Sequence, residues 1–341
     1  MSLIFLLSFI FILALIFFLI KKWANGPLNT NKKDLTGKLI IITGSSDGIG
    51  YEAAKDLLSS NAKVIFACRN KAKTEEKINE LPENLRKNAV FIQLDLQKFK
   101  SIENFVTEIK TKYPKIDILI NNAGMSSALL NKTEDGYLNT FQVNYLSTVL
   151  LTLLLLDHFN EKESKIINLS SVLYKSSKLT YGDSKYLNNY DLMDKLYKQE
   201  RQKPFDAYSD SKLLVLYFTQ YLADYCEKKY PYLKVVCLHP GVIFTKIFNM
   251  EKLFLKIISS IIKPILNCFA KDVVHGAQTT LFLSYSDNKD LVNGGYYNNL
   301  KLEKYVLKAK DEKLRNELVN ETLNILKSKY NELDYISLLS N

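Results

Sequence analysis

The sequence is poor in the residues that build disulfide frameworks, metal sites and nucleic-acid surfaces. Among 341 residues there are four cysteines without C-x-x-C spacing, three histidines far apart, and only four arginines among 46 basic residues. Isolated cysteines indicate reduced thiols in a cytosol-facing protein, and scattered histidines give no support for a metal site. Specific nucleic-acid recognition favours clustered arginine. The net charge of +10, carried by scattered lysines, therefore suits an anionic membrane face better than a nucleic acid.

A long apolar run stands near the start of the chain. From residue 3 to residue 20 every side chain but one is apolar, and Lys-Lys-Trp follows at 21–23. Such a run just spans the hydrocarbon core as a helix. The alternatives are a signal peptide, which would have a basic start and a small-residue cleavage site, and a buried core helix. The uncharged start and the basic C-terminal flank favour an uncleaved anchor at 1–24 with the following domain in the cytosol, and 25–36 is a polar linker.

A glycine-rich turn between a strand and a helix is the main pattern of the first half. Leu39–Ile42 is a continuous apolar run, typical of a buried parallel strand. The sequence T-G-S-S-D-G-I-G follows at 43–50 and leads into a helical stretch. Glycines permit a tight turn, and a helix N-terminus attracts pyrophosphate. This context predicts dinucleotide binding, although the spacing is G-x-x-x-G-x-G. The expected contacts here are Gly44, Ser45, Ser46, Asp47, Gly48, Ile49 and Gly50.

The end of the next strand bears on the choice of cofactor. The strand Val64–Ala67 ends in Cys68-Arg69-Asn70-Lys71. A turn that binds NAD carries a carboxylate here, which accepts hydrogen bonds from the ribose 2′-hydroxyl. This chain has no acid and two cations, Arg69 and Lys71, which suit a 2′-phosphate. The alternative is that Arg69 is a plain surface residue, but the missing acid favours NADP(H).

Two further strands end in polar or small residues. The run 90–94 ends at Asp95, which either contacts the adenine edge of the cofactor or caps the helix expected at 102–113. The run 116–120 ends in N-N-A-G at 121–124, where small side chains let the backbone approach a ligand at the sheet edge. The expected cofactor contacts are Asp95, Leu96, Asn122, Ala123 and Gly124.

Tyr208 and Lys212 form a candidate proton-transfer pair. Residues four apart point the same way on a helix, and the apolar stretch 213–218 that follows predicts that this helix is buried. A nearby ammonium favours the phenolate, so we expect Lys212 to lower the pKa of Tyr208 from its usual ~10, as suits a general acid/base. The pair alone does not distinguish an active site from a helix surface, because both residue types are abundant here.

The motifs occur in the order found in the classical short-chain dehydrogenase/reductase family, which this chain resembles over about residues 37–300. The resemblance rests on T-G-x-x-x-G-I-G at 43–50, N-N-A-G at 121–124 and Tyr208-x-x-x-Lys212. With the anchor and the Cys68-Arg69 pair, the chain is most similar to the membrane-bound retinol dehydrogenase group. The resemblance implies an α/β Rossmann fold with a doubly wound parallel sheet.

The resemblance also implies roles in the second half of the chain. It implies that Asn144 supports a proton-relay water, and that Ser171, with Ser170 as the fallback, hydrogen-bonds the substrate carbonyl oxygen. Further implied cofactor contacts are Tyr208, Lys212, Pro240, Gly241, Val242 and Thr245. The tyrosine-rich excursion 174–205 is longer than usual for the group and is expected to form a loop over the site or on the surface.

Four segments complete the chain. The dense apolar segment 244–269 is expected to form a lipophilic pocket entrance near the bilayer, or else a pair of core helices. Asp272–Ser284 is predicted to be a helix, and Asn293–Tyr297 a turn into the final edge strand. Asp311–Lys329 is a weakly amphipathic helix that packs on the domain or contacts another chain, as in a homodimer.

The sequence therefore predicts one catalytic domain at 37–300 and a helical extension at 301–341. The expected activity is an NADP(H)-dependent oxidoreductase that interconverts a lipophilic carbonyl (retinal-like, a lipid aldehyde or ketone, or a steroid) and its alcohol. In a reducing cytosol we expect it to work as a reductase. The alternative is a membrane-tethered, NADP-binding scaffold or sensor without turnover. The expected location is a membrane, that of the endoplasmic reticulum, with the catalytic domain facing the cytosol.

Overall fold

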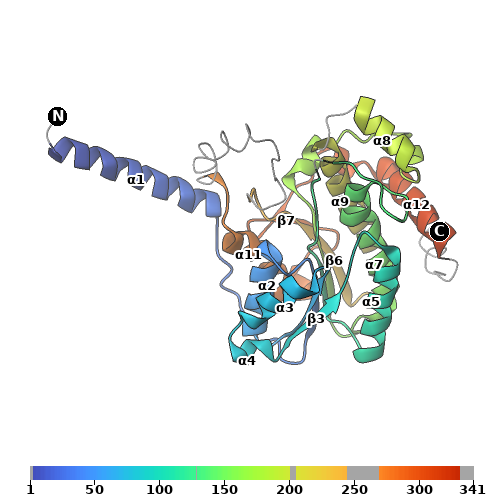
Figure 1. The fold of residues 1–341 in the computed structure, drawn as a ribbon, viewed down its shortest axis with the longest axis horizontal. Coiled ribbons are helices and arrows are strands. Elements are labelled where there is room, and N and C mark those ends of the chain that lie inside the picture. The colour runs from blue at the N-terminus through green and yellow to red at the C-terminus, as the bar shows by residue number, and fades with distance from the viewer. Residues whose placement is uncertain (1–2, 128, 200–204, 244–268, 331–341) are drawn as a thin grey trace.

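A mostly parallel sheet forms the centre of the protein (Figure 1). The computed structural model describes residues 3–127, 129–199, 205–243 and 269–330. Eight strands pair in the order β3-β2-β1-β4-β5-β6-β7-β8, and all neighbours are parallel except β7 and β8. The strands are β1 Leu39–Thr43, β2 Lys63–Cys68, β3 Ala89–Gln93, β4 Ile118–Asn121, β5 Ser164–Leu169, β6 Leu233–Leu238, β7 Tyr296–Asn298 and β8 Lys301–Glu303. The order reverses between β1 and β4, so the predicted doubly wound Rossmann fold is confirmed.

The first six strands come from the apolar runs seen in the sequence, whereas the edge of the sheet differs from the prediction. All five residues of β1 are buried, because helices cover both faces of the parallel sheet. The prediction that 293–297 leads into the final edge strand was wrong, since β8 follows β7 and takes that edge. Asn299 and Leu300 turn the chain with positive φ angles of 48° and 63°, as tight hairpins require. No glycine marks this turn, so the sequence gives little sign of it.

Helices cover the two faces of the sheet in separate layers (Figure 1). Buried side chains of α2, α3 and α11 pack on one face, and those of α5, α7, α9 and α12 pack on the other. The helices are α1 Leu3–Asn25, α2 Gly48–Ser59, α3 Lys71–Asn79, α4 Glu83–Arg86, α5 Phe99–Lys112, α6 Asn139–Phe141, α7 Ser147–Leu155, α8 Tyr190–Gln199, α9 Phe205–Lys229, α11 Val273–Tyr285 and α12 Glu312–Lys329.

The last described helix, α12, belongs to the main core. Leu314, Leu318 and Leu323 are buried against the same layer as α9. The hydroxyl of Tyr145 donates to Thr322 Oγ1 at 3.0 Å, which joins α12 to the π-helical turn Gln142–Leu146. The C-terminal segment therefore packs on the domain, and both sheet and core continue beyond residue 300.

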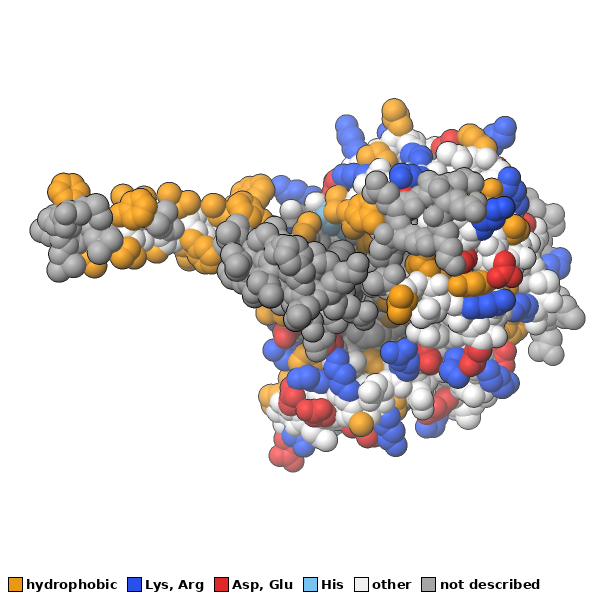
Figure 2. All heavy atoms as spheres, turned by 45° about the horizontal axis from the view of Figure 1, so that its top comes forward, with side chains coloured by type: hydrophobic (Ala, Val, Ile, Leu, Met, Phe, Trp, Pro, Cys, Tyr) orange, Lys and Arg blue, Asp and Glu red, His pale blue; other side chains and the backbone are white. Residues whose placement is uncertain are grey.

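The first helix, α1, projects away from the rest of the molecule (Figure 1). Apolar side chains cover this rod in Figure 2, whereas lysines and acids are interspersed over the remainder of the same view. Among the described residues two helical stretches are long and apolar enough to cross a membrane. Leu7–Asn25 is exposed, whereas Asn139–His158 is 94% buried and forms part of the core.

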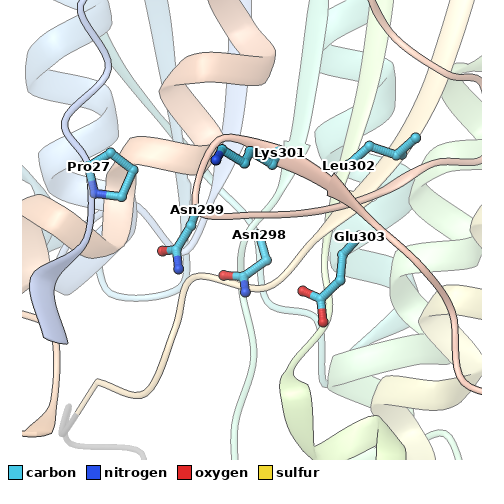
Figure 3. Close-up of a pocket in the computed structure, with 6 residues that line it drawn as sticks. All are labelled: Pro27, Asn298, Asn299, Lys301, Leu302 and Glu303. Atoms are coloured by element: carbon cyan, nitrogen blue, oxygen red, sulfur yellow. The ribbon is translucent and has the colours of Figure 1, made fainter. Parts of the chain in front are cut away.

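The base of α1 is fastened to the domain. Lys21 Nζ donates to the carbonyl oxygen of Ala270 at 2.6 Å, and Asn25 Nδ2 donates to Asp272 Oδ2 at 3.1 Å. Asp272 is also the N-cap of α11. The linker then passes a hollow of about 410 Å³ beside the β7–β8 hairpin (Figure 3). Its lining residues are Pro27, Asn298, Asn299, Lys301, Leu302 and Glu303.

Candidate active site

A cleft of about 690 Å³ lies at the carboxyl ends of the central strands. In doubly wound sheets this edge, where the strand order reverses, is the usual ligand site. The predicted site residues that line it are Gly44, Ser46, Asp47, Gly48, Ile49, Gly50, Arg69, Asp95, Leu96, Asn122, Ala123, Gly124, Tyr208, Lys212 and Pro240. The cleft lining does not include Ser45, Asn144, Ser171, Gly241 or Val242. Thr245 and most of the apolar segment 244–269 lie outside the described residues.

The glycine turn brings two loops of backbone into close contact. Gly44 has a φ of +67°, and a Cβ there would lie 3.0 Å from Ala123 Cα. A Cβ on Gly50 would lie 2.5 Å from Asn122 Nδ2, which donates to the carbonyl oxygen of Thr43 at 2.8 Å. Glycine is needed at both positions, because any side chain would push the turn away from the N-A-G segment.

Ser45 supports the turn from behind instead of facing the cleft. Its side chain is fully buried, and Oγ donates to the carbonyl oxygen of Ile42 at 3.0 Å. Asp47 caps α2 by accepting from the backbone amide of Gly48 at 2.8 Å. The N-terminus of α2, which favours anionic groups, therefore opens into the cleft.

Near the end of β2 the cleft is lined by the cations Arg69 and Lys73, and Lys73 was not among the predicted residues. Asn70 begins α3 by accepting from the backbone amide of Lys73, and Lys73 Nζ lies 2.7 Å from Asp47 Oδ2. Lys71, the second cation in the prediction, lies outside the cleft lining and pairs with Glu75 at 3.8 Å. Side chains in a helix lean toward its N-terminus. A prediction that Asn70 caps this helix would therefore have directed the Lys73 side chain toward the cleft.

Asp95 does not cap the following helix. The helix α5 begins at Phe99 and has Lys98 at its N-cap position, so the capping alternative was wrong. The Asp95 carboxylate instead accepts from the backbone amide of Gln97 at 3.0 Å. The backbone amide of Phe99 is satisfied by Asp135 at 2.9 Å. Asp95 remains in the cleft lining.

Tyr208 and Lys212 share a buried face of α9, but their electrostatics differ from the prediction. Lys212 Nζ lies 5.6 Å from the centroid of the Tyr208 ring and donates to the carbonyl oxygen of Leu169 at 2.9 Å. Burial raises the pKa of Tyr208, and a hydrogen bond with the Ser171 hydroxyl opposes that rise. Burial also lowers the pKa of Lys212 to about 8. The expected lowering of the Tyr208 pKa was therefore wrong in sign, because desolvation of the buried phenol outweighs its hydrogen bond with Ser171.

The two neighbouring serines after β5 have different partners. Ser170 lines the cleft, but its Oγ donates to the backbone carbonyl of Lys212 at 2.7 Å and so fastens α9 to the sheet. The Ser171 hydroxyl is hydrogen-bonded with Tyr208 and also accepts from the backbone amide of Leu173 at 3.3 Å. The geometry favours Ser171 over Ser170 as the partner of the phenol.

Asn144 joins three elements around the site. It lies in a π-helical turn, a rare irregularity that is frequent at functional sites. Its Oδ1 accepts from the backbone amide of Met125 at 2.7 Å, and its Nδ2 donates to the carbonyl oxygen of Met125 at 2.9 Å and to Ser211 Oγ at 3.0 Å. The side chain therefore holds the loop after β4 against α9, and a role in a water relay stays a prediction.

The excursion between Ser171 and Tyr208 is clasped to the catalytic helix. Asp210 lies between Tyr208 and Lys212 in the sequence and is almost fully buried. Its carboxylate accepts from Ser177 Oγ at 2.6 Å, from the backbone amide of Lys178 at 2.9 Å and from the Tyr197 hydroxyl at 2.9 Å. Residues from both ends of the excursion thus meet one carboxylate on α9. We call this arrangement the Asp210 clasp.

Comparisons with known proteins agree with this geometry. A family model described as short chain dehydrogenase matches residues 38–186. Human retinol dehydrogenase 14 is 35% identical over 301 residues, which cover 83% of this chain and 84% of the relative. The chain belongs to the short-chain dehydrogenase family. Mouse retinol dehydrogenase 12 is 32% identical over 326 residues, covering 95% of this chain and 97% of the relative, so the predicted likeness to retinol dehydrogenases is confirmed.

Family membership makes the protein an oxidoreductase that uses a nicotinamide cofactor. A solved structure also supports the fold. The crystal structure of an uncharacterized protein from Mycobacterium paratuberculosis superposes with a TM-score of 0.67 at 23% identity, covering 89% of this chain and 98% of that one. In doubly wound folds of this kind, the crevice at the switch point of the sheet is the usual dinucleotide site.

Proposed function

We propose that this protein is an NADP(H)-dependent oxidoreductase that interconverts a lipophilic carbonyl compound and its alcohol, and that it works as a reductase. The observation that carries the proposal is the set of Tyr208, Lys212 and Ser171 around the cleft. A phenol that lines the cleft is hydrogen-bonded to a serine, and a buried amine lies over its ring. The cofactor supplies the hydride, and the protein supplies position and proton transfer.

The raised pKa of Tyr208 suits a proton donor. The phenol stays protonated at neutral pH, so it can give its proton to the carbonyl oxygen while the carbonyl carbon is reduced. Ser171 directs that oxygen toward the phenol. With a pKa of about 8, Lys212 is largely an ammonium at neutral pH and stabilises the phenolate left behind. Asn144 holds the loop at Met125 and is the proposed support of a proton-relay water.

The preference for NADP(H) rests on the rim of the cleft. No carboxylate follows β2, and Arg69 and Lys73 both line the cleft near its end. An anionic 2′-phosphate would find charge-assisted donors there, whereas a free 2′-hydroxyl would find no acceptor at the end of β2.

The proposed substrate and location rest on the relatives and on α1. The chain is similar to proteins named retinol dehydrogenase, which supports a retinal-like substrate ahead of a lipid aldehyde, a ketone or a steroid. The exposed apolar surface of α1 supports an anchor at residues 1–24 in the endoplasmic reticulum membrane, with a catalytic domain at 37–300 in the cytosol. Residues 301–330 then extend that domain, because β8 joins its sheet and α12 packs in its core, and the rest of the proposed extension at 301–341 lies outside the described residues.

The decisive experiment compares the parent and Tyr208→Phe as purified, detergent-solubilised full-length proteins. NADPH oxidation is measured with retinal and a panel of carbonyl compounds, and NADPH binding is measured in parallel. Loss of the general acid should lower the rate ~10²–10⁴-fold and leave cofactor binding nearly unchanged. NADPH binding without oxidation by the parent, across the whole panel, would instead support the scaffold or sensor.

A further inference from the structure

Pro240, in the turn that follows β6, lines the cleft, whereas its neighbours His239 and Gly241 do not. His239 is buried, and Gly241 is in contact with the segment that precedes α11. We propose that His239 is a positioning residue that holds this turn in place for the cofactor through the acceptor nitrogen Nδ1 of its imidazole. The proposal rests on the proposed function in one respect, namely that the cleft binds the nicotinamide cofactor.

The bond within the turn defines the state of the imidazole. The backbone amide of Gly241 donates to His239 Nδ1 at 3.0 Å. An N–H donor requires a lone pair on Nδ1, so the ring proton must be on Nε2. Nε2 lies 4.0 Å from Glu303 Oε2, and the ring is stacked on Tyr296 with centroids 5.8 Å apart. Glu303 is seen on the β7–β8 hairpin in Figure 3.

The turn has little freedom to find another arrangement. Gly241 has a φ of +93°, and a Cβ there would lie 2.7 Å from Lys271 Cδ and Cε. The backbone amide of Lys271 donates to the carbonyl oxygen of Val242 at 2.8 Å, and its Nζ donates to Asn299 Oδ1 at 2.6 Å. The contacts of Lys271 and the hydrogen bond to His239 together restrain the turn, so loss of the His239 bond removes one of two restraints on Pro240 at the cleft wall.

Burial keeps the His239 ring neutral against the charge of Glu303. Glu303 on β8 favours the imidazolium, whereas Lys271 before α11 and Lys175, which pairs with Glu303 at 3.1 Å, oppose it. Among the described residues, the Tyr296 phenol of β7 also packs on the ring. Burial is the largest effect and lowers the pKa of His239 to about 4. The acceptor nitrogen is therefore available at every pH at which the enzyme is expected to work.

The alternative is that His239 only fills space against Tyr296. Two substitutions distinguish these two roles. Asparagine at 239 offers a side-chain oxygen that can accept from the backbone amide two residues on, as in an Asx-turn. Phenylalanine fills the ring position and stacks, but it accepts no hydrogen bond. A positioning role therefore predicts that His239→Asn is the milder change. A space-filling role predicts that His239→Phe is the milder one.

The experiment uses the full-length protein in detergent and measures NADPH binding by fluorescence titration, so that turnover is not needed. His239→Phe should weaken NADPH binding about 3- to 10-fold, the equivalent of one net hydrogen bond, and should speed hydrogen exchange in the peptide that contains Gly241. His239→Asn should stay within about twofold of the parent in both measurements. Equal effects of the two variants, or tighter binding by His239→Phe, would overturn the proposal.

Two further readouts keep the test decisive. If His239→Phe does not fold, ¹⁵N chemical shifts of the parent imidazole serve instead. A proton on Nε2 and none on Nδ1 between pH 5.5 and 8 is expected, roughly the range between the lowered pKa and working pH, and a protonated Nδ1 refutes the proposal. If the parent binds no NADPH, the proposed function fails, while the shifts and the exchange data still report on the turn.

Discussion

Replacing Lys73 by alanine should weaken the use of NADPH selectively. Lys73 lines the cleft and its side chain is 37% exposed, with Nζ 2.7 Å from Asp47 Oδ2. Lys71→Ala is the matched control, because it removes the same charge from the same helix. Lys71 is outside the cleft lining and its side chain is 67% exposed. Only a charge that contacts the 2′-phosphate should distinguish NADPH from NADH.

The expected loss of NADPH binding free energy follows from the exposure of Lys73. A hydrogen bond to a charged group contributes roughly 1.5–3 kcal/mol when it is well shielded, whereas exposed ion pairs contribute about 0.2–1 kcal/mol. Lys73 is partly exposed and must also share its charge with Asp47, so we expect about 1 kcal/mol. This corresponds to about a fivefold rise in the KM for NADPH. The KM for NADH should change less than twofold, as should both KM values of Lys71→Ala.

Asp47→Asn extends this test. Asparagine caps a helix about as well as aspartate, so α2 keeps its N-cap while Lys73 loses its ion-pair partner. NADPH should then bind more tightly, and adding Lys73→Ala should remove the gain. The assay is the ratio of kcat/KM for the two cofactors in initial-rate measurements on the full-length protein. An equal loss with both cofactors, or an equal loss in Lys71→Ala, would refute the reasoning.

Three other outcomes are expected. Leu318→Ala should lower the free energy of unfolding by about 2–5 kcal/mol in urea titrations, because this fully buried side chain joins α12 to the core. Leu307→Ala, at an 86% exposed position, should change it by less than about 0.5 kcal/mol. The rate of carbonyl reduction should fall as pH rises through about 8, where Lys212 loses its proton while Tyr208 keeps its own. A flat pH–rate profile from ~7 to ~9 would mean that Lys212 keeps its proton over this range, which contradicts a pKa of about 8. Protein that lacks residues 1–24 should stay in the supernatant after membranes are sedimented, and pelleting would mean that another surface binds the bilayer.

Lys212 also links folding to pH. Its pKa is lower in the folded protein, about 8, than the ordinary lysine value of 10.5. Between these values the unfolded chain binds more protons, so the free energy of unfolding gains a contribution that rises with pH across that window. Below about pH 8 the buried ammonium opposes folding by its full desolvation cost.

The parts of the fold that follow from local pattern were predictable. Buried parallel strands need apolar side chains on both faces, so runs such as Leu39–Ile42 located β1 to within one residue. The strand expected at 116–120 was less well placed, because β4 begins at Ile118 while Ile116 makes only a bridge to Phe159. The β7–β8 turn was missed because positive φ angles at Asn299 and Leu300 have no glycine to signal them.

The candidate site was predictable where a motif specifies its residues. It was less predictable where the direction of a side chain or its burial determines its role. The order of motifs selected Tyr208 and Lys212, and both line the cleft. The choice of Lys73 over Lys71 depends on where α3 begins, and sequence periodicity does not locate helix starts to one residue. The pKa of Tyr208 depends on desolvation, which requires the packed structure around the phenol.

The Asp210 clasp has a consequence for loop grafting within this family. Its carboxylate depends on Ser177, the backbone of Lys178 and Tyr197, which all belong to the segment that a shorter loop would replace. A chimera that carried a relative's loop would leave a buried anion without these donors, at a cost of at least roughly 1–3 kcal/mol. The loop therefore cannot be exchanged for a relative's loop without a change elsewhere in the chain. A successful exchange must supply equivalent donors to Asp210 or replace it by a residue that needs none.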